Sequence, residues 1–512
     1  MEGIATGKYA EAVGRGTSLI FMFSMLAAAI GYGFRIFLSR SLAVDEFGLF
    51  YSVVAFIATI GVFRELGLAT SLVKYISELK SKQNFAGIKS SIIMVFLAQT
   101  ILSVAIFTPL IFFSDILASQ YFGMPQASTV LFFLLIEAIV NMGIYSAVFQ
   151  GMQKFKIFGL IEIFRVSILF AFAIPLASNG AVGIALAQLL TTLVMNVIFV
   201  GIAFKEMPAL ISEKFVFDTK LLRNVFKFGL TLWLGNIIVM LVSRLDIIFI
   251  TYFRALKEVA WYNVSLPTAM LLTTFSAAVN NTLYPTVAEL WANGRKEDVA
   301  RGMESIIKFF FVLMLPPALV FLAYPDIIIT TLFGESYLPA SFSLQILSIG
   351  MLFSSISSIF LGVINGIGRP DMNAKVVSVV AGANFALNAL LVPFYGLDGA
   401  AAATAISFGI MFLMTFTFLR NKMKMGMHFG DIGRIFLGGL IALLAVAAAK
   451  EALIIEDALI ESAITFMISM TFYAAYLIAA KVMVKSDIEL LETSGFRLPD
   501  SIKSLMLRIL RN

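Results

Sequence analysis

Long apolar stretches separated by short polar connections run along nearly the whole chain. Fourteen of them have about the length of a bilayer-crossing helix, roughly 20 residues. They cover about 17–41, 47–73, 90–113, 128–149, 157–178, 181–204, 228–253, 261–284, 304–324, 341–364, 375–393, 398–419, 432–450 and 462–481. The pattern predicts an all-α polytopic membrane protein with about fourteen transmembrane helices and no soluble domain.

The positive charges of the connections alternate between the two sides of the predicted membrane. With the N-terminus inside, 29 of the 37 Lys and Arg residues lie on the inner side, five on the outer side and three deeper within spans. Cytoplasmic loops carry the excess of Lys and Arg in membrane proteins. We therefore expect a multi-pass protein of the cell membrane with both termini in the cytoplasm. The first run is too long for the core of a signal peptide, so we expect it to be retained.

Composition excludes several classes of function. Of the 512 residues, 60% are hydrophobic and 13% charged, which is incompatible with a soluble globule. The chain has no cysteine, so it has no disulfide and no thiolate metal site. Its Gly-rich runs lack P-loop spacing and no large loop holds the acidic pair of a glycosyltransferase, so we expect neither an enzyme nor an organic cofactor. The net charge of +6 suits basic loops beside anionic lipid better than nucleic acid, and His428 is interpreted as a loop residue.

The first six spans resemble the next six. Residues 45–51 align with 257–263, 77–79 with 288–290, Phe122-Gly123 with Phe333-Gly334, Gln150-Gly151 with Asn365-Gly366, and 179–183 with 395–399. Matches in order at nearly one offset indicate an internal repeat. An even number of spans inserts both halves the same way, which predicts parallel repeats and two lobes that rock around a central cavity.

The repeat sets the predicted domain boundaries. We expect an N-terminal lobe over 1–204, a cytoplasmic linker over 205–227, a C-terminal lobe over 228–420, two extra spans over 421–485 and a cytoplasmic tail over 486–512. In the tail, Ile502, Leu505, Met506 and Ile509 share one helix face. This spacing fits a helix on the cytoplasmic leaflet, and a frayed terminus is the alternative.

Several short motifs resemble those of a known family. Arg40 to Gly48 (Arg-Ser-Leu-Ala-Val-Asp-Glu-Phe-Gly) is similar to the signature after the first span of polysaccharide exporters. Further matches are Glu65-Leu-Gly-Leu, Arg244-Leu-Asp246, Tyr284-Pro285 with Glu289, Asn365-Gly-x-Gly368 and Gly396-Leu-x-Gly399-Ala-Ala-x-Ala403. Over nearly its whole length the chain resembles the polysaccharide-transporter and O-antigen flippase branch of the multidrug/oligosaccharidyl-lipid/polysaccharide exporter superfamily, with an architecture like that of the lipid II flippases. The resemblance implies flipping of a prenyl-diphosphate-linked oligosaccharide from the inner to the outer leaflet.

Four arginines in or at the edge of spans are candidates for binding a diphosphate, because a guanidinium donates two parallel hydrogen bonds and stays charged. They are Arg35, Arg64, Arg165 and Arg244, and Glu65 adjoins Arg64. Each has a structural alternative. Arg165 follows Glu162 by three residues, which favours an ion pair, and Arg35 could reach the outer headgroups. Arg244 has the strongest functional case, while Glu137 and Asn141, on one face of the fourth span, could line a cavity or bridge helices.

A second cluster has the oxygen ligands of a cation site. Asn384 and Asn388 lie four residues apart on one predicted helix, and Asp246, Asn388 and Thr404 fall at about one depth, roughly 8–11 Å below the outer surface. A hard cation such as Na⁺ prefers oxygen ligands. The pattern also resembles the sodium site of the lipid II flippases, with Asn388 where an acid is usual. The alternative is a cluster of hydrogen bonds between helices.

Three functions compete at this level. The first is the oligosaccharide-lipid flippase, with lipid-linked oligosaccharide and membrane lipid as partners, glycosyltransferases or a polymerase of the same pathway as neighbours, and a monomeric state. The second is a multidrug or organic-cation antiporter of the same superfamily, which would favour carboxylates over intramembrane arginines. The third is a membrane scaffold for glycan assembly without transport.

Overall fold

Every regular element in the described part of the chain is a helix, which confirms the predicted all-α fold. The computed structural model describes residues 2–141, 143–423, 429–452, 458–480 and 482, so His428 and the predicted tail helix lie outside it. Ten described stretches are long and apolar enough to cross a membrane. Two of them, Phe155–Glu206 and Pro370–Met423, are each long enough for two crossings. The number of fourteen spans stays a prediction.

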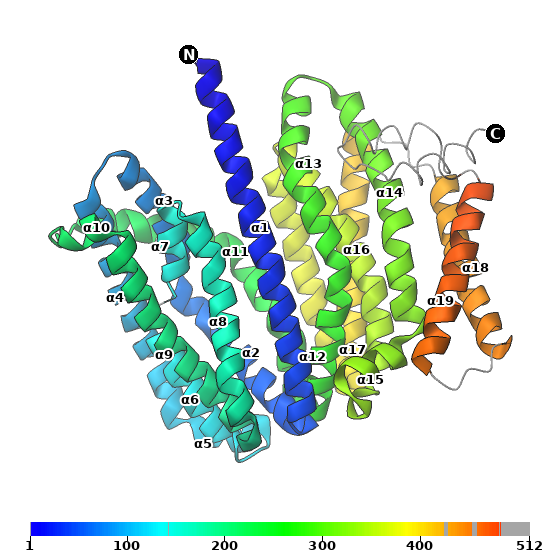
Figure 1. The fold of residues 1–512 in the computed structure, drawn as a ribbon, viewed down its shortest axis with the longest axis horizontal. Helices are drawn as coiled ribbons and strands as arrows, with labels where there is room; N and C mark the ends of the chain where they lie inside the picture. The colour runs from blue at the N-terminus through cyan, green and yellow to red at the C-terminus, as the bar shows by residue number, and fades with distance from the viewer. Residues whose placement is uncertain (1, 142, 424–428, 453–457, 481, 483–512) are drawn as a thin grey trace. The chain divides into compact units, whose positions relative to one another are not determined.

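Packing divides the chain into two compact units. Figure 1 colours the chain by residue number, so the helices of each unit can be found by their labels and colours. The first comprises residues 1–263 and 388–397, and the second comprises 264–387 and 398–512. The predicted lobes and linker are defined by the internal sequence repeat and not by packing, so they stay a prediction. Helices α12 and α17 contribute residues to both units.

The helices of the first unit are α1 (Glu2–Ser41), α2 (Val44–Glu65), α3 (Leu68–Ser81), α4 (Phe85–Phe112), α5 (Ser114–Leu117), the π-helical η1 (Ala118–Phe122), α6 (Ala127–Val140), α7 (Tyr145–Gly151), α8 (Phe155–Leu176), the 3₁₀ turn η2 (Ala177–Asn179), α9 (Gly180–Glu206), α10 (Pro208–Ser212), α11 (Thr219–Phe253) and the start of α12 (Leu256–Met270). The second unit contains the 3₁₀ turn η3 (Leu271–Thr273), α13 (Thr274–Ala292), α14 (Lys296–Ala323), α15 (Pro325–Phe333), the 3₁₀ turn η4 (Glu335–Tyr337), α16 (Ala340–Gly366), most of α17 (Pro370–Met423), α18 (Phe429–Ala452) and α19 (Ala458–Ala479). Helix α11 already begins at Thr219, within the range predicted as a linker, and the Asp218 side chain accepts hydrogen bonds from Lys220 N and Leu221 N at its start.

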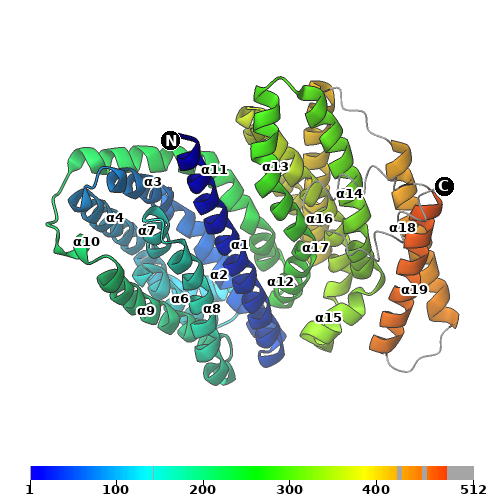
Figure 2. The same ribbon diagram turned by 45° about the horizontal axis from the view of Figure 1, so that its top comes forward.

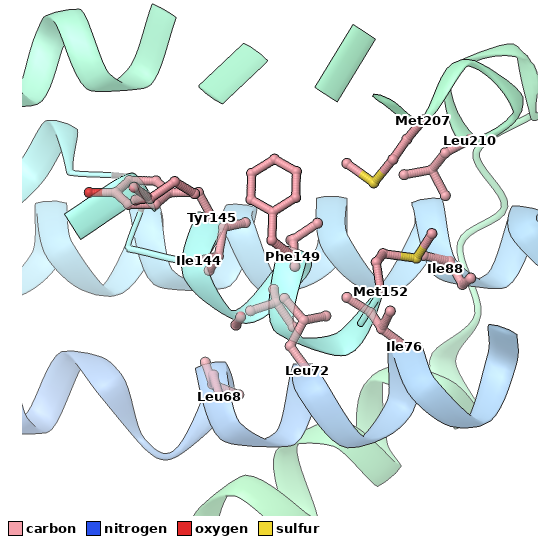
Figure 3. Close-up of a cluster of buried hydrophobic side chains, with 14 of the residues drawn as sticks. Leu68, Leu72, Ile76, Ile88, Ile144, Tyr145, Phe149, Met152, Met207 and Leu210 are labelled. Carbon is pink, nitrogen blue, oxygen red and sulfur yellow. The ribbon is translucent and has the colours of Figure 1, made fainter. Parts of the chain in front are cut away.

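A buried apolar cluster packs several helices of the first unit together (Figure 3). It joins α3, α4, α7, α10 and the start of α11, with Leu72, Phe149 and Val225 among the buried side chains. In the same unit α1 packs along α8, as Figure 2 shows, and α11 packs on α2 and α3. The short helix α7 is thereby held on several sides, which fixes the break that precedes it.

Two predicted spans are interrupted rather than continuous. The span expected over 47–73 ends as α2 at Glu65, and Leu66 and Gly67 take positive φ angles of 41° and 67° before α3 begins. A Cβ at Gly67 would lie 2.2 Å from the carbonyl oxygen of Gly229 in α11, so only glycine permits this close packing. The span expected over 128–149 is broken between α6 and α7, where Asn141, Gly143 and Ile144 are not helical.

The predicted repeat is matched by two equivalent contacts of a glutamate with a glycine. Glu46 lies near the start of α2 and packs on Gly180 at the start of α9, where a Cβ would be 2.1 Å from the glutamate Oε1. Glu258 lies near the start of α12 and packs on Gly396 of α17, and its Oε2 accepts a hydrogen bond of 2.9 Å from Leu397 N. Both glycines have positive φ, 64° and 57°. The sequence alignment pairs Glu46 with Glu258 and Gly180 with Gly396. The same contact between two helices therefore occurs in both halves of the repeat.

We predict that Gly180→Ala destabilises the protein, because it forces a Cβ onto the Glu46 carboxylate at a backbone conformation of φ 64° and ψ −150°. Strain of this kind costs about 1–3 kcal/mol. The expected result is a lower melting temperature of the detergent-solubilised protein. Gly201→Ala is the matched control, since it lies on the same helix with nothing within 4 Å of the added Cβ. Equal melting temperatures for both variants would contradict the strain.

Candidate functional site

The break between α6 and α7 exposes backbone carbonyls that a continuous helix would have satisfied. Within the described chain, the last helical bond of α6 runs from Asn141 N to Glu137 O, at 2.9 Å. The Asn141 side chain then accepts a hydrogen bond from Gly143 N at 2.9 Å, which closes a turn at the helix end, and Gly143 has a φ of 53°. Irregular backbone at membrane depth is tolerated only where protein or a wet cavity satisfies it.

Two polar side chains supply the missing donors. Arg64, from α2, donates to the carbonyl oxygens of Ala138 and Asn141 at 3.1 and 2.6 Å. Asn196, from α9, donates to Val140 O at 2.8 Å. The candidate phosphate ligand Arg64 is therefore engaged in closing a helix end, although its Nε has no hydrogen-bond partner within the described chain.

Glu137 forms the polar centre of this region. Its Oε1 accepts hydrogen bonds from the Thr192 hydroxyl at 2.8 Å and the Asn141 amide at 3.0 Å. Both donors are neutral, and among the described residues no cation lies within ion-pair distance of the carboxylate. Its other oxygen remains available to a ligand.

Two adjoining cavities border this region inside the first unit. The larger, of about 420 Å³, is called the arginine cavity here, and its polar lining consists of Arg64, Glu65, Glu137, Gln188 and Arg244. Its remaining lining is apolar and comes from α2, Phe107, Leu134 and Ala138. The smaller, of about 300 Å³, is called the polar cavity and is lined by Glu137, Asn141, Gly143, Tyr145, Ser146, Glu162, Arg165, Leu169, Gln188, Thr191, Thr192 and Met195. Glu137 and Gln188 line both cavities.

Arg244 is the candidate arginine that the structure leaves available. It lies on α11, it is exposed, and it lines the arginine cavity together with Arg64 and Glu65. Within the described part of the chain its guanidinium makes no hydrogen bond or ion pair to the protein, so its donors face the cavity.

The other two arginines have partners. Arg165 forms an ion pair with Glu162 through two hydrogen bonds, which is the structural alternative expected from their spacing. The pair is not buried, with 36% and 50% of the two side chains exposed in the polar cavity wall. Arg35 donates to the Asn263 carbonyl oxygen and lies over the Tyr51 ring at 4.5 Å. That carbonyl has no helical donor because Pro267, four residues on, lacks an N–H.

Among the candidate cation ligands, hydrogen bonds join one pair within each unit. Asp246 accepts a hydrogen bond from the Asn388 amide at 2.7 Å, and its second oxygen accepts one from the Tyr262 hydroxyl. In the second unit Asn384 donates to the Thr404 hydroxyl at 3.3 Å. The Asn388 amide and the Tyr262 hydroxyl both donate to Asp246, which is the geometry of hydrogen bonds between helices.

Sequence reasoning named Arg64 but missed the helix break and Asn196, the second donor that satisfies it. A signal was present, because Gln188, Thr192 and Asn196 recur every four residues and so share one face of α9. Asn141 and Gly143 in the middle of an apolar span were a second signal, since both residue types favour turns. Tyr262 had no such signal.

Comparison of the sequence with known proteins identifies its family. The model of the polysaccharide biosynthesis protein family matches residues 37–342. The chain belongs to this family. An uncharacterised membrane protein of Methanocaldococcus jannaschii is 28% identical over 92% of this chain and 95% of its own length. The probable low-salt glycan biosynthesis flippase of Haloferax volcanii is 21% identical over 83% of this chain and 88% of its own.

The fold has a close structural counterpart. The lipid II flippase MurJ, in an inward closed conformation, matches with a TM-score of 0.71 over 90% of this chain and 97% of that chain, at 14% identity. The family and the fold class expected from the sequence are therefore both confirmed.

We predict that Arg64→Leu lowers stability and that Arg244→Leu does not. The first change leaves two carbonyls without donors, at a cost of about 1–3 kcal/mol each, whereas Arg244 makes no such bond in the described chain. The measurement is thermal unfolding of both variants in detergent, followed by size-exclusion chromatography. Wild-type stability in Arg64→Leu would mean that the break does not depend on the arginine.

Proposed function

We propose that the protein is a flippase that moves a prenyl-diphosphate-linked oligosaccharide from the cytoplasmic to the outer leaflet by alternating access. The observation that carries the proposal is Arg244, an exposed guanidinium in a cavity of about 420 Å³ with no protein partner in the described chain. A diphosphate is the ligand that an available guanidinium fork fits best. Membership of the polysaccharide biosynthesis family and a relative named as a glycan biosynthesis flippase support the cargo class.

A cation antiporter is the second candidate, because Glu65 and Glu137 line the same cavity. Arg64 and Arg244, however, share the wall of this cavity with the two glutamates. A bound organic cation would face two guanidinium groups. This arrangement favours an anionic head group.

We predict that Arg244→Ala abolishes flipping of a fluorescent prenyl-diphosphate glycan in proteoliposomes, scored by a membrane-impermeant quencher. A hydrogen bond to a charged group contributes about 1.5–3 kcal/mol, which corresponds to a loss of about tenfold or more. Arg244→Lys should restore part of the rate, since lysine keeps the charge and loses the fork.

Arg223→Ala is the matched control, because it removes the same charge from the same helix outside both cavities. It should flip at the wild-type rate. A fully active Arg244→Ala would refute the role of Arg244, and transport of an organic cation in place of the lipid would assign the protein to the antiporters.

Sodium coupling remains a prediction, and variants of Asp246 and Asn388 can test it. For Na⁺ to bind there, the Asn388 amide would have to turn its oxygen toward the ion, since its nitrogen now donates to Asp246. Under this prediction wild-type flipping responds to a sodium gradient, and Asp246→Asn loses the response while it still binds cargo. Asn388→Asp should strengthen the sodium dependence by adding charge. Wild-type flux that ignores sodium would assign Asp246 to helix packing.

A further inference from the structure

We infer that the polar cavity is a sugar subsite that binds the sugar residue next to the diphosphate, while the arginine cavity binds the phosphates. The inference rests on the proposed function. It adds that the two parts of the head group, sugar and diphosphate, bind in different cavities. They adjoin, because Glu137 and Gln188 line both. A cargo whose phosphates reach Arg244 would therefore place its first sugar beside Glu137.

The lining of the polar cavity suits hydroxyl groups. Nine of its twelve lining residues are polar, with Leu169 and Met195 among the few exceptions. Ser146 and Gln188 are half-buried in its wall, and within the described chain neither side chain has a hydrogen-bond partner. The Ser146 hydroxyl and the Gln188 amide each offer both a donor and an acceptor. A sugar hydroxyl also donates and accepts, so it can satisfy them.

The same lining opposes a phosphate. Each cavity has two carboxylates in its wall, Glu65 and Glu137 in the arginine cavity and Glu137 and Glu162 in the polar cavity. The one arginine of the polar cavity, Arg165, is paired with Glu162, whereas Arg244 is available in the other. Like charges in a medium of low dielectric constant repel strongly. A phosphate is therefore favoured beside Arg244 and a neutral sugar beside Ser146.

Size and rigidity are consistent with one small polar group. A volume of about 300 Å³ is at the lower end of the usual range for ligand pockets, about 300–1,000 Å³. The wall is held by the helix break, where Thr192 and Asn141 fix Glu137 and the apolar cluster anchors α7 (Figure 3). Ser146 lies on that anchored helix, one residue after Tyr145.

The test compares two fluorescent probes bound to the purified full-length protein in lipid nanodiscs. One is a prenyl diphosphate that carries a single hexose, and the other is the same prenyl diphosphate without sugar. We expect the wild type to bind the sugar-bearing probe more tightly. Ser146→Ala should weaken that probe by about threefold to tenfold, since it removes one neutral hydrogen bond. It should leave the sugar-free probe unchanged.

A second variant fills the cavity instead of removing one bond. Ser146→Leu should reduce binding of the sugar-bearing probe to that of the sugar-free one, and its folding is checked by the unchanged affinity for the sugar-free probe. Gln150→Leu is the control, because Gln150 is exposed on the same helix outside both cavities. Arg244→Gln should weaken both probes equally.

The outcomes separate the two proposals. Equal wild-type affinity for both probes, or Ser146 variants that weaken both probes alike or neither, would overturn the sugar subsite while leaving the flippase in place. Failure of the wild type to bind either probe would overturn the proposed function itself.

Discussion

Backbone carbonyls without helical partners are the constraint on which the site depends. Hydrocarbon offers no water to a broken helix end, so protein groups must satisfy it. At the end of α6, Arg64 and Asn196 do so for the carbonyls of Ala138, Asn141 and Val140. The donor that permits the break also places a guanidinium in the wall of the arginine cavity. Fold and site therefore share one set of hydrogen bonds.

The same constraint separates the arginines that a sequence cannot tell apart. Arg35 serves the Asn263 carbonyl that Pro267 leaves without a donor, and Arg64 serves the end of α6. Arg165 is held by Glu162. Arg244 alone of the four has no such engagement in the described chain, which is why the proposed function places the phosphates there. The hydrogen-bond partners of each arginine therefore distinguish the three that serve the protein structure from the one that is available to a ligand.

The sequence predicted most of the fold, because apolar length and charge bias are local properties of the chain. The predicted spans over 181–204 and 341–364 correspond closely to α9 and α16. It could not predict the break after α2, because Gly67 packs against the carbonyl of the distant Gly229, whereas Asn141 and Gly143 were a local signal for the break after α6. For the same reason it could not assign Arg64, whose partners are carbonyls more than 70 residues away along the chain. Asp246 was expected beside Asn388 and is found there, whereas the donor Tyr262 had no pattern to reveal it.

Charge balance at the break explains why Glu137 and Arg64 belong together. The C-terminal end of a helix carries about half a negative charge, and Glu137 adds a carboxylate within the last turn of α6. Two negative groups at one end would be unfavourable in a medium of low dielectric constant. Arg64 compensates for the helix end, because it donates directly to the carbonyls, and its positive charge lines the same cavity as Glu137 without forming an ion pair with it. Its hydrogen bonds are thus committed to the protein, and under the proposed function the attraction for an anionic head group is left to Arg244.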